Sequence, residues 1–194
     1  MSQPVYELLT PDRLPALRIL NSVLFPVKFH DQVYRDALMC GDITQLAYVD
    51  GTLVGAIMCR LEVKGGGAQL YIVSLGVLAP YRGQGIASQL LARSLAACAD
   101  DAAIASAALH VHSGDDEVQA WYAKRGFEVQ ERILGYYKRL RPPDALLLCR
   151  QLGGPGGGGG GGGEQAAAEG AAAGGGPGAE QAHAAAAGGG GGGT

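Results

Sequence analysis

A glycine-spaced basic turn, Arg82-Gly83-Gln84-Gly85, follows an apolar segment and opens a helical one. Its two glycines let backbone N–H groups approach an anion closely, and the positive end of the following helix faces the same point. Arg82 adds a planar fork of donors suited to phosphate oxygens. A Walker loop would need Gly-Lys-Ser/Thr, and the dinucleotide fingerprint needs a third small residue where Ser88 is only a partial match. The turn therefore indicates a phosphate-bearing ligand outside these two nucleotide classes.

Histidine is the side chain best suited to accept a proton near neutral pH, and two histidines lie close together downstream of this turn. His110 and His112 share one face of an expected strand over 107–112, so periodicity alone does not choose between them. On the strand before the turn, the same alternation places Tyr71, Val73 and Leu75 on one face.

The elements that position these side chains follow from periodicity and turn signals. Strands are expected at 5–9, 46–49, 53–63, 70–77, 107–112, 127–133 and 145–152. Helices are expected from Pro11 (capped by Thr10) to Leu24, over 31–40, from Gln84 to Cys98, and from a cap at Asp115 or Ser113 to Gly126. The order β-α-α-β-β-β-α-β-α-β-β predicts an α/β (α+β) fold with four helices on a mixed central sheet of about seven strands. The fourth and fifth strands, joined through a helix, are expected to pair in parallel.

Composition divides the 194 residues into two parts. From Gly153 onward the chain is almost entirely glycine and alanine and contains no aromatic residue, Leu, Ile, Val, Lys or Arg. Such a segment cannot bury enough apolar surface to offset its ordering entropy, so 153–194 is expected to be a disordered tail. Residues 1–152 then form one folded domain with 15 acidic and 15 basic residues. This balance argues against a nonspecific nucleic-acid binder.

The cysteines are scattered, without Cys-x-x-Cys spacing, which argues against a zinc site and for reduced thiols. They are Cys40, Cys59, Cys98 and Cys149. No signal peptide and no membrane-spanning apolar run is visible. The expectation is a cytoplasmic protein, with the nucleus left open, that has no metal, nucleic-acid or membrane partner.

The spacing Arg82-x-x-Gly85-x-Ala87, together with the element order over 5–152, resembles the GNAT acetyltransferases. The resemblance implies the GNAT fold, acetyl-CoA as co-substrate and no metal. It also implies the coenzyme-binding residues Leu75, Gly76, Val77, Arg82, Gly83, Gln84, Gly85, Ile86, Ala87, Ser88, Asp115, Tyr122 and Lys124.

Segments 21–29, 70–76, 108–111, 121–127 and 135–140 narrow the resemblance to the catalytic subunits of NatE-type N-terminal acetyltransferases. That family implies Tyr71 and His110 as the pair that handles the amine proton, through an ordered water rather than by direct contact. It implies that Tyr122 protonates the CoA thiolate. We expect the oxyanion to meet a backbone N–H near Leu75 or Val77, where the fourth strand should bulge. Trp121 is most simply a core residue.

The same resemblance implies a slot for an initiator methionine and the residue after it. Its residues are Phe25, Pro26, Val27, Phe29, Val73, Tyr136, Tyr137, Lys138 and Arg139. The implied activity is acetylation of the N-terminal amine of peptides that begin with Met followed by an apolar residue, with slower acetylation of lysine side chains. Implied partners are peptide or protein N-termini and the auxiliary and catalytic subunits of an N-terminal acetyltransferase complex near the ribosome. Phe29, where the family has tyrosine, and Asp115, where it has asparagine, depart from the pattern.

Two alternatives remain. A GNAT enzyme for small amines such as polyamines would favour an acidic, open pocket over the aromatic 25–29 segment. The second alternative is a weakly active accessory subunit of an N-terminal acetyltransferase complex. The presence of both Tyr71 and His110 favours an active enzyme over this alternative.

Overall fold

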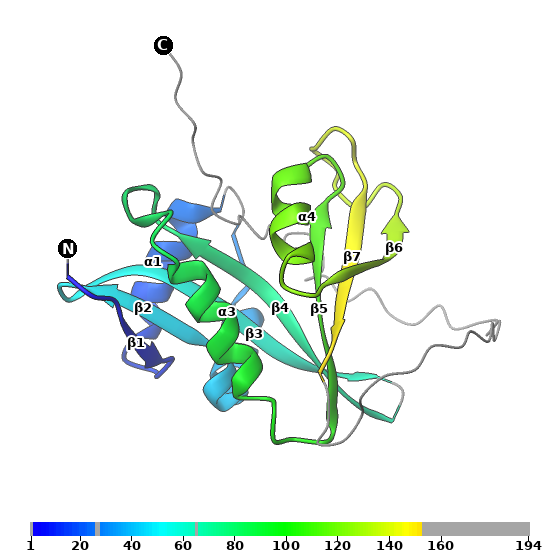
Figure 1. Cartoon of the computed structure of the whole chain (residues 1–194). Coiled ribbons are helices and arrows are strands. Elements are labelled where there is room, and N and C mark those ends of the chain that lie inside the picture. The colour runs from blue at the N-terminus through cyan, green and yellow to red at the C-terminus, as the bar shows by residue number, and fades with distance from the viewer. Residues whose placement is uncertain (1, 26–27, 65, 153–194) are drawn as a thin grey trace, which may run out of the picture.

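One seven-stranded mixed sheet forms the centre of the molecule, with strand order β1-β2-β3-β4-β5-β7-β6 (Figure 1). The computed structural model describes residues 2–25, 28–64 and 66–152. The expected tail at 153–194, and Pro26 and Val27 of the expected slot, therefore lie outside the described residues. The strands are β1 (Val5–Leu8), β2 (Gln45–Val49), β3 (Thr52–Lys64), β4 (Gly67–Val77), β5 (Ile104–His112), β6 (Glu128–Ile133) and β7 (Ala145–Gln151).

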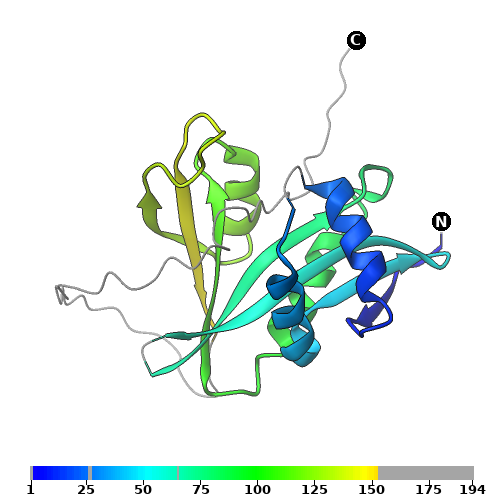
Figure 2. The ribbon, with the colours of Figure 1, turned by 180° about the vertical axis from the view of Figure 1, so that it is seen from behind.

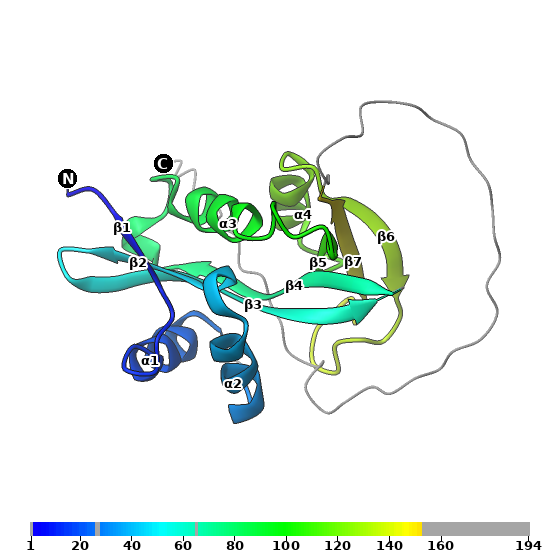
Figure 3. The ribbon, with the colours of Figure 1, turned by 90° about the horizontal axis from the view of Figure 1, so that it is seen from below.

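In the described part of the chain, four α-helices cover the two faces of the sheet, as Figure 3 shows. Helices α1 (Leu14–Leu24) and α2 (Asp31–Met39) lie on one face, and α3 (Ile86–Ala96) and α4 (Asp116–Ala123) lie on the other. Short 3₁₀ helices, η1 (Gly41–Ile43) and η2 (Ala79–Tyr81), precede β2 and α3. The order of strands and α-helices predicted from the sequence is confirmed. No helix in the described ranges is long and apolar enough to cross a membrane.

Helix α1 begins later than the sequence pattern predicts. Thr10 does not cap it; instead Thr10 O accepts from Arg13 N at 3.0 Å and from Leu14 N at 3.2 Å in a turn that precedes the helix. Pro15, not Pro11, occupies the first helical turn. Either proline satisfies the preference for that position, so the local signal was ambiguous.

The sheet separates two apolar clusters. Leu90 and Leu91 of α3 and Tyr122 of α4 pack in the first cluster, whereas Leu17 of α1 and Tyr34 of α2 pack in the second. Each pair of helices thus buries its apolar side against its own face of the sheet. This packing holds the N-terminal end of α3 and the side of α4 on the same face.

Strands β4 and β5 pair in parallel, as predicted, but only over part of their lengths. The paired stretch runs from Ala68, opposite Ile104, to Tyr71, opposite Ala108. Beyond it β4 continues to Val77, while β5 runs on to His112 paired only with β7. The two strands consequently diverge between α3 and α4, as Figures 1 and 2 show from front and back.

A bulge in β4 changes which side chains share a face. Met58 of β3 lies opposite Ser74 but Cys59 lies opposite Ile72, so Val73 is an extra residue in β4. Because one added residue reverses the alternation, Tyr71 and Val73 pack in the second cluster and Leu75 in the first. The predicted common face is therefore wrong for Leu75, and the bulge lies at Val73 rather than near Leu75 or Val77.

Candidate active site

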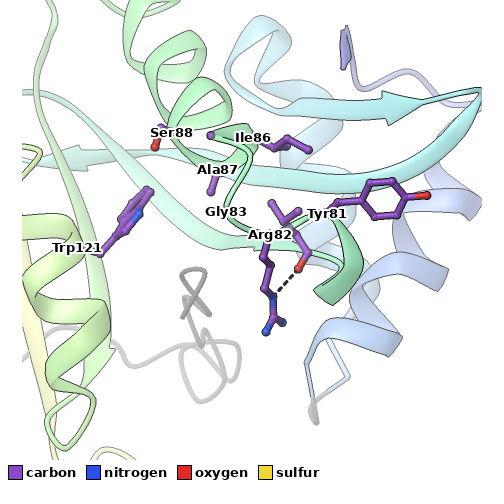
Figure 4. Close-up of a pocket in the computed structure, with 9 residues that line it drawn as sticks. Tyr81, Arg82, Gly83, Ile86, Ala87, Ser88 and Trp121 are labelled. Atoms are coloured by element: carbon purple, nitrogen blue, oxygen red, sulfur yellow. Dashed lines mark hydrogen bonds between the residues drawn. The ribbon is translucent and has the colours of Figure 1, made fainter. Parts of the chain in front are cut away.

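A cavity of about 250 Å³ lies where the end of β4, η2, the start of α3 and the side of α4 meet. It is lined by Val77, Tyr81, Arg82, Gly83, Gly85, Ile86, Ala87, Ser88 and Trp121. Figure 4 places Trp121 on one side, Tyr81 and Arg82 on the other, and the first turn of α3 with Ser88 above. Seven of the predicted coenzyme residues thus lie together around one cavity.

The glycine turn adopts the backbone that its spacing predicts. Gly83 has φ 74° and Gly85, which caps α3, has φ 79°, a region that residues with a Cβ adopt only with strain. The N–H groups of the first helical turn have no partner within a helix, so those of Ile86, Ala87 and Ser88 can serve a ligand. With the positive end of the helix dipole, they make this end of the cavity attractive to an anion.

Arg82 is tied to the strand that precedes the turn. Its Nε donates to Val77 O at 3.0 Å, as drawn in Figure 4, and its side chain is exposed. Among the described residues no carboxylate forms an ion pair with it. Within the described residues, no ion pair therefore balances the guanidinium charge next to the turn.

The other predicted coenzyme residues do not line this cavity. Leu75 and Gly76 lie in β4, Gln84 in the turn donates to Pro80 O at 3.5 Å, and Lys124 is exposed at the end of α4. Asp115 caps α4, because its Oδ1 accepts from Val118 N at 3.0 Å. The Asp115 carboxylate, which departs from the family pattern, thus accepts a hydrogen bond from the first turn of α4.

Tyr122 is completely buried in the first cluster. Within the described part of the chain its hydroxyl has no hydrogen-bond partner. Burial raises the pKa of this phenol far above its usual range, so Tyr122 holds its proton at physiological pH. A buried hydroxyl without a partner is costly, which favours a ligand that accepts from it.

Tyr71 and His110 meet where β4 and β5 begin to diverge. Tyr71 Oη and His110 Nδ1 lie 2.7 Å apart, a hydrogen bond whose proton can sit on either atom according to the histidine tautomer. Burial raises the pKa of Tyr71 well above 10 and lowers the pKa of His110 below 6.5. Both groups are therefore neutral at pH 7, and the pair can accept a proton.

Charged side chains surround this pair. Glu62 and Glu131 act to raise the pKa of His110, whereas Arg60 and Lys64 act to lower it, and all four effects are smaller than that of burial. The Arg60 guanidinium lies 4.8 Å from the centre of the Tyr71 ring and pairs with Glu62. The local charges thus act in opposite directions, and burial, the largest effect, lowers the pKa of His110.

His112 has a different environment. Its Nε2 donates to Pro142 O at 2.6 Å, and its ring meets Tyr137 edge-on at 5.6 Å. The structure therefore joins His110, and not His112, to Tyr71.

Aromatic side chains from two loops flank the pair on the face covered by α1 and α2. Phe25 is buried and meets Phe29 edge-on at 5.8 Å in the segment before α2. From the loop between β6 and β7, Tyr136 stacks on His110 at 4.9 Å with the rings 13° from parallel, and Tyr137 packs against Tyr136. The predicted slot residues that the structure describes include these four aromatics, buried Val73, and exposed Lys138 and Arg139.

Sequence reasoning missed one residue of the cavity wall and one residue that contacts the wall from behind. Trp121, predicted as a core residue, is only partly buried and lines the cavity. Arg125, four residues later, places its guanidinium 3.5 Å from the centre of the Trp121 ring and donates to Ser88 Oγ at 2.6 Å. An aromatic and a cation four apart on a helix was the available signal, because such residues are neighbours on its surface.

The chain is similar to known acetyltransferases in sequence and in fold. The model of the acetyltransferase (GNAT) family matches residues 3–127. N-alpha-acetyltransferase 50 of Danio rerio is 39% identical over 146 residues, covering 75% of this chain and 87% of that protein. The probable N-acetyltransferase san of Drosophila melanogaster is 36% identical, covering 74% and 78%.

A solved structure of Arabidopsis thaliana Naa50 in complex with the bisubstrate analogue CoA-Ac-MVNAL superposes with a TM-score of 0.71. It is 40% identical, and the match covers 76% of this chain and 97% of that one. The family match, the identities and the shared fold lead to one conclusion. The chain belongs to the GNAT family of acetyltransferases, in the group of N-alpha-acetyltransferase 50 and San.

Proposed function

We propose that this chain transfers an acetyl group from acetyl-CoA directly to the N-terminal amine of peptides that begin with Met followed by an apolar residue. The observation that carries the proposal is the neutral Tyr71–His110 pair, flanked by aromatic rings, at the point where β4 and β5 diverge. The names of the relatives support N-terminal acetylation. The peptide in the Arabidopsis complex begins with Met and Val, which supports the expected preference.

The reaction requires a neutral amine. A peptide α-amino group has a pKa of about 7.7–8.0, so a modest base suffices to remove its proton near neutrality. The Tyr71–His110 pair accepts that proton, through one water, and the amine nitrogen then forms a bond to the thioester carbonyl carbon. The negative charge that develops on the carbonyl oxygen meets a backbone N–H of β4 between the bulge at Val73 and Val77.

Collapse of the tetrahedral intermediate breaks the carbon–sulfur bond and releases a thiolate. Tyr122 gives this thiolate its proton, a role supported by a buried hydroxyl that has no partner among the described residues. The transfer is direct, and no cysteine takes part. Burial raises the pKa of the Cys59 thiol well above its usual range and that of Cys98 to about 11, so neither is a nucleophile at neutral pH.

The aromatic slot explains the preferred substrate. Burying a methionine side chain contributes roughly 1.5–3 kcal/mol, which corresponds to a preference of about one or two orders of magnitude over a small polar residue. Phe25 and Tyr137 are buried and Phe29 is partly exposed, and an acidic first residue would gain little from contact with these rings. Slower acetylation of lysine side chains, a cytoplasmic location and assembly into an N-terminal acetyltransferase complex near the ribosome belong to the proposal through the family resemblance alone.

Initial rates of CoA release, measured for the purified full chain with a panel of amines, test the substrate class. We expect kcat/KM for a Met-Leu peptide to exceed that for an otherwise identical Asp-Asp peptide by at least about tenfold. Spermidine should be a poor substrate. Equal rates on the two peptides would contradict the slot, and faster turnover of spermidine would favour the small-amine alternative.

A further inference from the structure

Just beyond the C-terminal end of α4 lies a guanidinium that the family pattern did not mark for the coenzyme. Arg125 is partly buried, and its side chain crosses from α4 to the first turn of α3. Nη1 donates to Trp121 O at 2.7 Å, and Nη2 donates to Ser88 Oγ at 2.6 Å. Both Trp121 and Ser88 line the cavity, so Arg125 lies directly behind two of its wall residues.

The charge of Arg125 is not balanced within the described residues. None of the ion pairs found there includes Arg125, and its nearest ring contact is the face of Trp121 at 3.5 Å. Burial lowers its pKa, which is the effect of partial desolvation on a cation. A cation that has lost water and gained no counter-charge gains most from an anionic ligand.

Ser88 links this cation to the phosphate-binding turn. It is in the first turn of α3, and its Oγ accepts from Arg125, so its own hydroxyl hydrogen can be donated to another group. A hydroxyl that accepts from a cation is polarised and is a stronger donor. Figure 4 places Arg82, in the turn before α3, and Trp121 of α4 on opposite sides of the cavity, and the Arg125 guanidinium lies over the Trp121 ring.

We propose that Arg125, with the hydroxyl of Ser88, is a second anion contact for the coenzyme, at the part of the cavity formed by Ser88 and Trp121. The ligand group is a phosphate of CoA, either the diphosphate or the 3′-phosphate. The inference rests on the proposed function, since it concerns the same coenzyme. Arg125 also joins α3 to α4, and a role in stability alone predicts no change in coenzyme affinity.

Calorimetric titration of the full chain with CoA and with 3′-dephospho-CoA separates these possibilities. Arg125→Met should weaken CoA binding by about tenfold or more, the usual effect of losing a charge-assisted contact. The slope of log affinity against log salt concentration should also become shallower, because one cation has been removed from the contact with phosphate. Arg125→Gln, which keeps a donor for Ser88 but removes the charge, should lose similar affinity and is the safer variant for folding.

The matched control is Arg93→Met. Arg93, in α3, also places its guanidinium over an aromatic ring, 4.7 Å from the centre of Tyr6, but within the described residues it neither lines the cavity nor contacts a residue that the cavity's lining includes. It should leave both affinities unchanged, and a melting curve for each variant measures stability separately.

Each outcome is decisive. Equal losses for CoA and 3′-dephospho-CoA would assign the contact to the diphosphate, and a loss for CoA alone would assign it to the 3′-phosphate. Unchanged affinity of Arg125→Met or Arg125→Gln for both ligands, with the wild type binding CoA, would overturn the inference and leave the proposed function intact. If the wild-type chain itself does not bind CoA, the proposed function fails, and the inference fails with it.

Discussion

His110 and His112 lie two residues apart on one face of β5, yet their surroundings give them different chemistry. His110 is joined to Tyr71 and stacked on Tyr136, with a pKa lowered by burial. His112 donates to the Pro142 carbonyl, a bond that holds a loop. A base needs a lone pair that is available near neutral pH, and the His110–Tyr71 pair meets this requirement.

We expect His110→Ala to lower kcat by about 10²–10⁴-fold, the usual contribution of a positioned base. Because the pKa of His110 lies below 6.5, the histidine is already neutral above about pH 6.5. The wild-type kcat/KM should therefore rise mainly with deprotonation of the peptide amine, near about pH 7.7–8.0, with a further decline below pH 6.5 from His110. For His110→Ala, kcat/KM should still rise with deprotonation of the peptide amine but should show no further decline below about pH 6.5. Steady-state rates between pH 5.5 and pH 9 check both points.

His112→Ala is the matched comparison. It should change the peptide KM more than kcat, because it frees the loop that carries Tyr136 and Tyr137. Loss of turnover in His112→Ala alone, with His110→Ala active, would show that the assignment of the base is wrong.

Among the elements around the site, the loop between β6 and β7 is joined at both ends by one carboxylate. Asp144 is buried and accepts from Gly135 N at 3.0 Å and from Arg132 Nη2 at 2.7 Å. The Gly135 N–H, the larger contribution, and Arg132 lower the pKa of Asp144, so the carboxylate stays ionised at neutral pH. These bonds fix the start and end of the loop that places Tyr136 against His110.

Asp144→Ala should therefore raise the peptide KM by about tenfold through misplacement of the aromatic wall, and change the acetyl-CoA KM little. Steady-state kinetics with each substrate varied in turn gives the two constants. Glu128→Ala, an exposed carboxylate on β6, is the control and should change neither. A larger effect of Asp144→Ala on the acetyl-CoA KM than on the peptide KM would contradict this role of the loop.

The bulge in β4 illustrates what local sequence patterns cannot predict. Alternation correctly placed Tyr71 and Val73 on one face, because the reversal caused by the bulge takes effect only after Val73. It failed for Leu75, since a bulge depends on how β3 and β4 pair and neither strand carries a proline or a turn motif at that point. The later start of α1 has a similar cause, because both Pro11 and Pro15 fit a first helical turn.

Across the whole molecule, the element order and the phosphate-binding turn at Arg82 were predictable from strong local signals. Glycines with positive φ, apolar periodicity and the parallel crossover each restrict the chain independently, and together they define the fold. Contacts between side chains distant in sequence were not predictable in this way. The Arg125–Ser88 bond joins residues 37 apart, and the Tyr71–His110 bond joins residues 39 apart.

The central claim is direct transfer of acetyl from coenzyme to the peptide amine. Its most direct test is a single turnover of the purified chain with acetyl-labelled acetyl-CoA and a Met-Leu peptide, followed by mass spectrometry of peptide and protein. We expect one labelled acetyl group on the α-amine of the peptide for each CoA released, and no label on the protein before the peptide is added. Label bound to the enzyme beforehand, or CoA released without acetylated peptide, would contradict it.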